Sequence, residues 1–281
     1  MRFWYDDALA DDPRVSVLDH GLTVGDGVFE TLKVIDSVPF AMDRHLTRLR
    51  RSAQRMGVPE VSHDLVREAV RQTVAACIPT GRGRLRITVT SGPGPLGSDR
   101  GDGRPTLVVM AVAQQPWPAT TSALVVPWRR NERSVLADVK STSYAENVVA
   151  LAHAHAEGYS EALFLDTHDR LSEGTGTNVF LVLGDRVATP SLDCGALQGI
   201  TRELVLEWAA ESGMRIGEQH LMLADLATAD EVFLTSSTRD VHPVTRLTVQ
   251  ETGLNRDLPY GEVTRAVAET FARRSQENAN P

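Results

Sequence analysis

One lysine in this chain stands where a lysine can do covalent chemistry. Lys140 follows a short apolar run and opens the polar stretch 141–144, which leads into an expected helix over 147–157. A lysine that sits in a pocket and has lost its proton can form a Schiff base with an aldehyde. Most lysines are solvated surface charges instead, so Lys140 alone leaves both interpretations open.

A carboxylate follows further along the chain. Glu173 is expected in a glycine-bounded turn between two strands, over 162–166 and 178–183. Such a group can hold a pyridinium nitrogen protonated, which makes the ring of a cofactor an electron sink. It can also be an ordinary surface charge. The role of Tyr144 is also open, because its hydroxyl could bind the ring oxygen of a cofactor or its ring could pack on the core.

A candidate phosphate site precedes an expected helix over 202–212. The N–H groups of Ile200 and Thr201, which follow Gly199, would point out of the helix start and attract an anion. The alternative is an ordinary N-cap formed by Thr201.

Further phosphate donors are available elsewhere in the sequence. Ser236 and Ser237 end an expected strand over 231–235, where their hydroxyl groups either bind a ligand or form a turn. Arg48 lies on an expected helix over 42–56 and off its apolar stripe. Its planar guanidinium suits phosphate, although a solvated charge is the simpler interpretation.

The bulk composition excludes several classes of function. The chain has 281 residues, a net charge of −8, 42% hydrophobic and 23% charged residues, which is typical of a globular protein with no affinity for nucleic acid. No apolar run is long enough to cross a bilayer. The N-terminus lacks a secretion signal, which predicts a cytoplasmic protein. Cys77 and Cys194 are too few for a disulfide framework, and we expect no metal site.

We predict two domains of mixed α+β structure: 1–115, a linker over 116–123, and 124–281. In the first, strands over 16–21 and 28–34 flank a glycine turn, and Phe29, Thr31 and Lys33 share one face of the second strand. A Gly- and Pro-rich loop over 91–101 is expected to bind a ligand. The remaining expected elements are helices over 42–56 and 65–76 and strands over 85–90, 106–112 and 124–128, with a final helix over 261–274 and a frayed polar tail.

Together these segments resemble the class IV (fold type IV) pyridoxal-phosphate enzymes. That family includes D-amino-acid, branched-chain and (R)-selective amine transaminases and aminodeoxychorismate lyases. The resemblance implies a smaller N-terminal α/β domain and a larger C-terminal domain with a β-barrel-like core. The matching pieces, in the order of the family, are Gly25–Thr31, His45–Leu49, Lys140–Asn147, Ser172–Gly174 with Thr177–Phe180, Gly199–Arg202 and Phe233–Thr238.

The resemblance also implies roles for individual residues. Lys140 would form the Schiff base with pyridoxal 5′-phosphate and then move the substrate's α-proton. Glu173 would pair with the pyridine nitrogen, and Tyr144 with the ring oxygen. The active unit would be a homodimer with its active site near the subunit interface. The phosphate would be held by Arg48, Ile200, Thr201, Ser236 and Ser237, with Thr177 also in the cofactor site.

Substrate choice depends on the loop after the strand over 85–90. In D-amino-acid transaminases this loop carries a carboxylate-binding arginine, and here apolar Leu96 stands in its place, with Arg100 nearby. We therefore predict a transaminase for D-amino acids or (R)-amines with pyruvate or a similar acceptor. Aminodeoxychorismate lyase is the main alternative, followed by a branched-chain aminotransferase and a non-catalytic binding protein. Candidate substrate residues are Phe29, Thr31, Lys33, Leu96 and Arg100.

Overall fold

A computed structural model describes residues 2–5 and 7–281 of the chain, which form two compact units. The first unit includes the chain up to Pro116, together with Val139–Tyr144 and Ala279–Pro281, and the second contains Trp117–Asp138 and Ala145–Asn278. The division differs from the expected one in three respects. Residues 121–123, expected in a linker, begin strand β7. The segment that carries Lys140 and the last residues, Ala279–Pro281, are grouped with the first unit.

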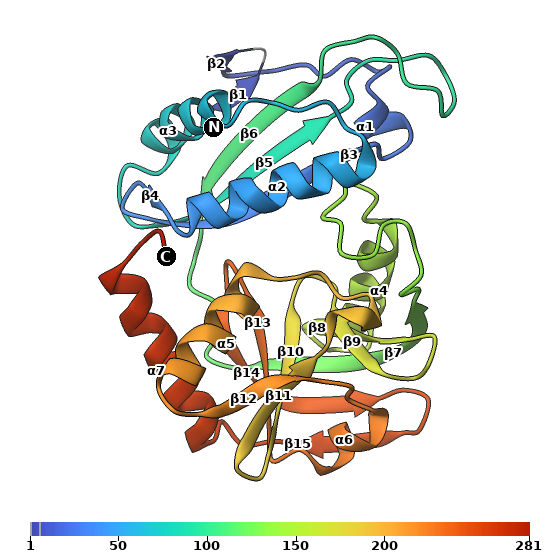
Figure 1. Ribbon diagram of the computed structural model, residues 1–281, viewed down its shortest axis with the longest axis vertical. Coiled ribbons are helices and arrows are strands. Elements are labelled where there is room, and N and C mark those ends of the chain that lie inside the picture. Colours follow the sequence, from blue (N-terminus) through green and yellow to red (C-terminus); the bar gives the residue numbers. More distant parts are fainter. Residues whose placement is uncertain (1, 6) are drawn as a thin grey trace. The chain divides into compact units, whose positions relative to one another are not determined.

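The first unit is built on an antiparallel sheet with helices α2 and α3 on one face (Figure 1). The strand order is β2-β1-β6-β5-β3-β4. The expected helices and the strands β3, β5 and β6 are confirmed. The elements are β1 (Phe3–Tyr5), β2 (Ala8–Ala10), α1 (His20–Thr23), β3 (Gly27–Ile35), β4 (Val38–Pro39), α2 (Met42–Met56), α3 (His63–Cys77), β5 (Arg82–Thr90) and β6 (Thr106–Ala113).

Strand register separates the two faces of this sheet. Val28, Leu32 and Val34 of β3 are fully buried and pack with the apolar residues of α2 and α3 in the core of the unit. On the opposite face, Thr31 pairs with Arg86 of β5, and Lys33 pairs with Arg84. Directly paired residues of antiparallel strands lie on the same side of a sheet. The face away from the helices therefore collects basic side chains.

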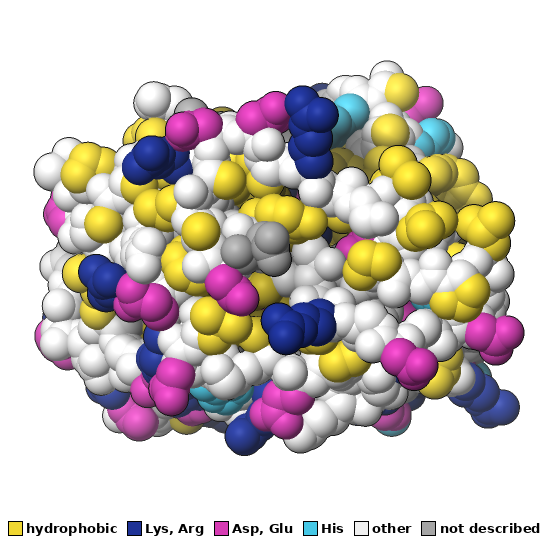
Figure 2. Space-filling view, turned by 90° about the horizontal axis from the view of Figure 1, so that it is seen from above, with side chains coloured by type: hydrophobic (Ala, Val, Ile, Leu, Met, Phe, Trp, Pro, Cys, Tyr) yellow, Lys and Arg dark blue, Asp and Glu magenta, His cyan; other side chains and the backbone are white. Residues whose placement is uncertain are grey.

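The prediction of a strand over 16–21 is wrong, because helix α1 begins at His20. Asp19 caps this short helix by accepting a hydrogen bond from Gly21 N at 2.8 Å, and a capping carboxylate favours a helix start over a strand. Around α1, hydrophobic side chains gather on the right of the face in Figure 2, the side on which Figure 1 shows α1. The exposed large hydrophobic residues of this segment, 44–76% exposed, are Val15, Val17, Leu18, Leu22 and Val24.

The second unit contains a mixed nine-stranded sheet in the order β12-β11-β10-β13-β14-β7-β8-β9, with β15 paired to β14. The sheet curls, because β9 at one end lies beside β10. The expected mixed α+β class is confirmed. The elements are β7 (Thr121–Arg130), α4 (Ala145–Ala156), β8 (Glu161–Asp166), β9 (Leu171–Gly174), β10 (Asn178–Leu183), β11 (Arg186–Pro190), η1 (Leu192–Cys194), α5 (Ile200–Glu211), β12 (Arg215–Gln219), α6 (Leu223–Thr228), β13 (Glu231–Ser236), β14 (Asp240–Val249), β15 (Leu254–Asp257) and α7 (Glu262–Glu277).

Two further expectations need correction. Glu173 lies within strand β9 and not in a turn, because β9 pairs with β8 through Leu163 and Gly174. The polar tail is held and not frayed: Ala41 N donates to Ala279 O at 2.7 Å, and Arg44 Nε donates to Pro281 O at 3.0 Å. Among the described helices, none combines the length and apolar character needed to span a membrane.

Candidate active site

The backbone of Lys140 is held by β3 and α2 of the first unit. Phe29 N donates a hydrogen bond to Lys140 O at 2.9 Å, and Lys140 N donates to Ser52 Oγ of α2 at 3.3 Å. Next to it, Ser141 forms an isolated bridge with Val28. The lysine segment thus continues the sheet edge for a few residues. All of these contacts use the Lys140 backbone, so they fix the position from which its side chain extends.

Phe29 is the aromatic centre of this part of the first unit. Lys140 Nζ lies 4.3 Å from the centre of the Phe29 ring, and Arg86 Cζ lies 3.8 Å from the same centre. Tyr144 meets Phe29 edge to face, with the ring centres 5.3 Å apart. A cation over an aromatic face is attracted by the electron density of the ring. Phe29 and Tyr144 therefore join Lys140 in one cluster.

Arg86 was missed in the sequence because an arginine in an alternating strand resembles an ordinary solvated residue. In the structure it is half-buried, and burial lowers the pKa of its guanidinium, which remains a cation at neutral pH. Because Arg86 Cζ and Lys140 Nζ both lie close to the centre of the Phe29 ring, the two cations are near one another. The pairing of Arg86 with Thr31 is the signal that could have revealed it, but that pairing requires the strand register.

The buried carboxylate of Glu30 explains why this residue interrupts the apolar face of β3. Arg48 Nε and Nη2 donate to its two oxygens at 2.8 and 2.7 Å, and His45 Nδ1 lies 2.6 Å from Oε2. Burial opposes ionisation of Glu30, but the charge and hydrogen bonds of Arg48 and His45 lower its pKa to about 2. Arg48 is therefore buried and rigidly held, and is not the solvated charge that its sequence position suggested.

Acid should weaken the first unit through Glu30. The pKa is 4.5 in a model compound and about 2 in the fold, so between these values the unfolded chain binds a proton that the folded chain does not. The stabilisation, about 3 kcal/mol, is complete above about pH 5 and lost as the pH falls toward 2. Urea unfolding of wild type and Glu30→Gln at pH 6 and pH 3 should give a stability difference that shrinks in acid.

The exposed carboxylate Glu60 supplies the control for this measurement. Glu60→Gln should leave the pH dependence of unfolding unchanged. A wild-type advantage over Glu30→Gln that is equally large at pH 6 and pH 3 would contradict the assignment.

Arg100 is held away from a substrate role. Its Nε and Nη2 donate to the Asp26 carboxylate, both at 2.6 Å, and it also donates to the carbonyl oxygens of Met56 and Gly57 at the end of α2. The hydrogen bonds from Arg100 keep the pKa of Asp26 below its usual value. Leu96 is 84% exposed. We propose that Arg100 anchors the loop that carries Leu96 to Asp26 and does not bind the substrate.

In the second unit, the start of α5 provides amide donors. The helix begins at Ile200 after Gly199, so Thr201 lies inside the helix and is not the N-cap. The first N–H groups of a helix have no partner within it and attract anions. A Cβ atom on Gly199 would lie only 2.0 Å from Asn178 Oδ1, so a larger residue here would require the Asn178 side chain to move.

The hydroxyl groups of Ser236 and Ser237 belong to the neighbouring strand end. Asn178, which lies against Gly199, pairs in the sheet with Thr235 of β13, immediately before Ser236. Ser236 Oγ accepts a hydrogen bond from Arg239 N at 3.2 Å, which leaves its own proton to be donated. The α5 start and the end of β13 thus converge within the second unit.

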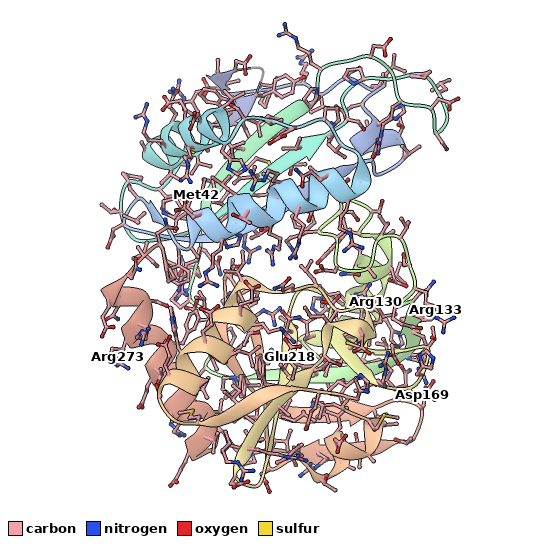
Figure 3. The ribbon with its side chains drawn as sticks, viewed as in Figure 1. Met42, Arg130, Arg133, Asp169, Glu218 and Arg273 are labelled. Atoms are coloured by element: carbon pink, nitrogen blue, oxygen red, sulfur yellow. The ribbon has the colours of Figure 1, made fainter. Side chains whose placement is uncertain are left out.

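Two carboxylates secure the peptide that precedes α5. Leu197 N donates to Glu173 Oε2, and Gln198 N donates to Asp138 Oδ1, both at 3.0 Å. Asp138 adopts a left-handed backbone conformation with φ 56°, which aspartate tolerates better than most residues. Arg130, at the end of β7 (Figure 3), lies 3.3 Å from Glu173 Oε1 through its Nη2 atom. Glu173 is therefore fixed from two sides, with its side chain 13% exposed.

Thr177 supports the turn that follows Glu173. Its hydroxyl donates to Glu161 Oε2 at 3.3 Å, and Thr175 N donates to Glu161 Oε1 at 3.1 Å. Glu161 is fully buried, and Asn147 Nδ2 binds Thr175 O at 2.6 Å. The structure thus uses Thr177 to hold this turn in place.

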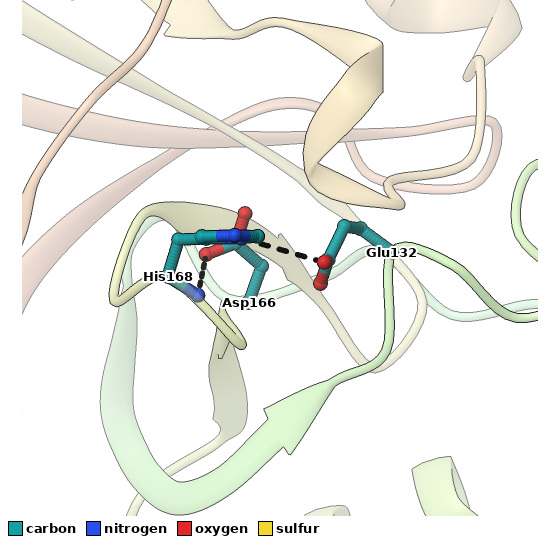
Figure 4. Close-up of side chains that lie close together, drawn as sticks. All are labelled: Glu132, Asp166 and His168. Atoms are coloured by element: carbon teal, nitrogen blue, oxygen red, sulfur yellow. Dashed lines mark hydrogen bonds and ion pairs between the residues drawn. The ribbon is translucent and has the colours of Figure 1, made fainter.

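A separate cluster of Glu132, Asp166 and His168 has the composition of a metal site (Figure 4). Asp166 Oδ1 accepts from His168 N and Arg170 N at 2.9 Å, and its Oδ2 accepts from Arg170 Nε at 2.6 Å. Glu132 accepts from the Thr167 hydroxyl at 2.8 and 2.9 Å. Since these oxygens already serve the turn after β8, we give the cluster a structural role.

The first unit contains a lysine among aromatic rings, and the second contains a fixed carboxylate and an anion-binding helix start. Pyridoxal-phosphate enzymes use groups of these kinds. The chain matches the family model described as amino-transferase class IV over residues 27–247, and it belongs to that family. It is 35% identical to a putative branched-chain-amino-acid aminotransferase of Methanocaldococcus jannaschii over 92% of this chain and 91% of that protein. It is also 29% identical to the aminodeoxychorismate lyase of Bacillus subtilis, over 84% and 82%.

Solved structures agree with this assignment. The branched-chain aminotransferase from Thermoproteus uzoniensis with norvaline matches with a TM-score of 0.89 and 29% identity, over 97% of this chain and 94% of that one. A hypothetical aminotransferase from Mycobacterium tuberculosis in its PLP-bound form gives 0.83 and 27%, over 97% and 98%. The predicted fold type IV and the predicted cofactor, pyridoxal 5′-phosphate, are confirmed. The donors at the α5 start, the Glu173 carboxylate and Lys140 suit the phosphate, ring nitrogen and aldehyde of this group.

Proposed function

We propose that the protein is a transaminase that moves the amino group of an amino acid to a 2-oxo acid. When bound, pyridoxal 5′-phosphate supplies an electron sink for the bond that breaks at the substrate α-carbon. Lys140 would bind the aldehyde and, once the substrate amine has displaced it, would take the proton from that carbon as a general base. Glu173 would hold the ring nitrogen, and Tyr144 the ring oxygen. The phosphate would be held by Arg48, Ile200, Thr201, Ser236 and Ser237.

The observation that carries this proposal is the position of Arg86 over the same ring as Lys140. A half-buried arginine near the reacting amine favours a substrate with a carboxylate, because its planar fork binds carboxylates through two hydrogen bonds. Leu96 suggested that the site lacked such a cation and accepted plain amines. Arg86 supplies the cation from β5, so we replace the (R)-amine prediction by an amino acid. The names of the relatives reported above favour branched-chain amino acids over D-amino acids.

The basic face of the first sheet favours a second carboxylate in one of the substrates. Lys33 lies on the same face as Arg86 and is only 6% exposed, with Nζ 4.6 Å from the centre of the Phe40 ring. A dicarboxylic 2-oxo acid such as 2-oxoglutarate fits such a face as the amino acceptor. Aminodeoxychorismate also carries two carboxylates, so the same residues, with the Bacillus subtilis relative, make the lyase the second candidate.

A substrate panel with one variant tests the proposal. L-leucine with 2-oxoglutarate should react at least about tenfold faster than D-leucine with 2-oxoglutarate, or (R)-1-phenylethylamine with pyruvate. Arg86→Gln should raise the KM for L-leucine or 2-oxoglutarate about thirtyfold, because a lost buried carboxylate contact costs about 2 kcal/mol or more. Its reaction with the amine, which has no carboxylate, should change less. Initial rates of amino-acid formation measure all of these.

Arg84→Gln is the matched control, since Arg84 is an exposed arginine two residues away on the same strand and face. It should alter KM by less than about threefold. Faster turnover of the (R)-amine than of L-leucine, with Arg86→Gln unaffected, would restore the amine transaminase. Release of 4-aminobenzoate from aminodeoxychorismate, without amino transfer, would establish the lyase.

We further propose a homodimer, in which the exposed apolar segment Val15–Val24 takes part in the contact. Exposed hydrophobic side chains that cluster on a surface are typical of contacts between proteins. Light scattering of the purified protein decides this point, and a monomer at micromolar concentration would contradict it.

A further inference from the structure

The guanidinium of Arg130 lies at a junction of the second unit. Nη1 donates to Glu146 Oε2 at 2.6 Å and to Asn147 Oδ1 at 3.0 Å, both from α4. Nη2 lies 3.3 Å from Glu173 Oε1, and Cζ lies 4.4 Å from the centre of the Phe164 ring of β8. The residue, labelled in Figure 3, thus connects α4 with the carboxylate of Glu173 in β9.

This arginine is not satisfied as a purely structural residue would be. Its side chain is only 14% exposed, yet Nε and Nη2 are buried with no hydrogen-bond acceptor among the described residues. A buried N–H group without an acceptor lowers the stability of the fold. An apolar residue of similar volume would usually be at least as stable at such a position, so a buried arginine there suggests that its charge is needed. Nη2 nevertheless lies at ion-pair distance, 3.3 Å, from Glu173 Oε1.

We propose that Arg130 is a positioning residue for Glu173, holding this carboxylate anionic and correctly oriented for the ring nitrogen of pyridoxal 5′-phosphate. The inference rests on the role proposed for Glu173. Glu173 lies between a cation and a donor: Arg130 Nη2 forms an ion pair with Oε1 at 3.3 Å, and the Leu197 amide donates to Oε2. A permanent cation favours the anionic form of a carboxylate at this distance, and the fixed amide defines its direction. The Phe164 ring also helps to hold the Arg130 guanidinium in place through a cation–π contact.

The other partners of Arg130 provide an internal comparison. Glu146 forms the shorter ion pair, but its side chain is 52% exposed, whereas Glu173 is 13% exposed. An ion pair that is open to water is screened and contributes little. Removal of Glu146 should therefore leave the Glu173 end of the junction intact, while removal of the Arg130 charge should not.

The test measures how apoprotein takes up pyridoxal 5′-phosphate, by titration of the visible absorbance band of the bound cofactor. Arg130→Gln should weaken the affinity about fivefold to tenfold and shift the band maximum. Arg130→Lys, which retains the charge but not the fork, should recover affinity to within about threefold of wild type. Glu146→Gln should stay within about twofold. Thermal unfolding of each apoprotein establishes that the variant is folded.

A double-mutant cycle separates this inference from the proposed role of Glu173. In a Glu173→Gln background, Arg130→Gln should cause no further loss of affinity, because the charge that it serves is gone. Equal losses in both backgrounds, or a loss in Glu146→Gln as large as in Arg130→Gln, would overturn the inference. If Glu173→Gln itself changed neither affinity nor the band, the role of Glu173 would fail instead. Should Arg130→Gln not fold, the same cycle is run with Arg130→Lys, whose smaller loss must also vanish.

Discussion

Lys140→Ala should abolish transamination, with a loss of about 10⁴-fold or more in kcat. Lys140 is assigned two tasks, covalent attachment of the aldehyde and transfer of the α-proton, and general acid–base catalysis alone contributes 10²–10⁴-fold. The visible absorbance band of the lysine-bound cofactor should disappear as well. The fold should survive, because the contacts that hold this segment use the Lys140 backbone: Phe29 N to Lys140 O, and Lys140 N to Ser52 Oγ.

Lys33→Ala is the matched control for this experiment. Lys33 is a second lysine of the first unit, 6% exposed and on the same sheet face as Phe29, so it tests whether any buried lysine would serve. It should keep the visible band and lose only affinity for carboxylate substrates. A band that persists in Lys140→Ala, or that is lost in Lys33→Ala instead, would assign the covalent role to another residue. Circular dichroism of both variants should match wild type.

Glu173→Gln should give the second largest effect, a loss of about 10²–10³-fold in kcat. A neutral amide cannot stabilise the proton on the ring nitrogen, and removal of one aimed electrostatic group in an active site typically costs this much. Leu197 N can still donate to the amide oxygen, so we expect the strand and the loop before α5 to remain in place. Affinity for the cofactor should fall by only about tenfold, because the phosphate donors at the start of α5 are unchanged and still bind it.

Rates measured at saturating cofactor distinguish the catalytic loss from the binding loss. Glu173→Asp keeps the charge on a shorter side chain and should recover part of kcat. A Glu173→Gln variant whose kcat returned to the wild-type value at saturation would show that Glu173 only binds the cofactor. The amide in that variant also leaves Arg130 beside a neutral group, which connects this experiment to the cycle proposed for Arg130.

The two units contribute different kinds of group to the proposed chemistry. The first provides the amine, the aromatic rings and the cations that favour a carboxylate substrate, namely Lys140, Phe29, Tyr144 and Arg86. The second provides the anion-binding helix start and the fixed carboxylate. The buried ion pair of Glu30 and Arg48 joins β3 to α2. Arg48 therefore stabilises the fold in addition to its role in the proposed phosphate site.

Local signals in the sequence were sufficient for most regular elements, whereas the cofactor followed from the resemblance of several motifs to a known family. The apolar stripe of α2 with Gly57 after it, and the alternation of β5, predict structure because periodicity depends only on neighbouring residues. Short elements were missed or misassigned. The strand expected over 16–21 failed because Asp19 is satisfied by Thr90 and Thr106, which are distant in sequence.

The sequence by itself determined the family, the Lys140 and Glu173 motifs and the cofactor, because these depend on residue type and order along the chain. Only the tertiary structure decided which charges meet. It placed Arg86 beside the ring shared with Lys140, tied Arg100 to Asp26, and gave Glu30 and Glu173 their arginine partners. The physical reason is that an ion pair or cation–π contact depends on strand register and helix packing, which no local pattern encodes.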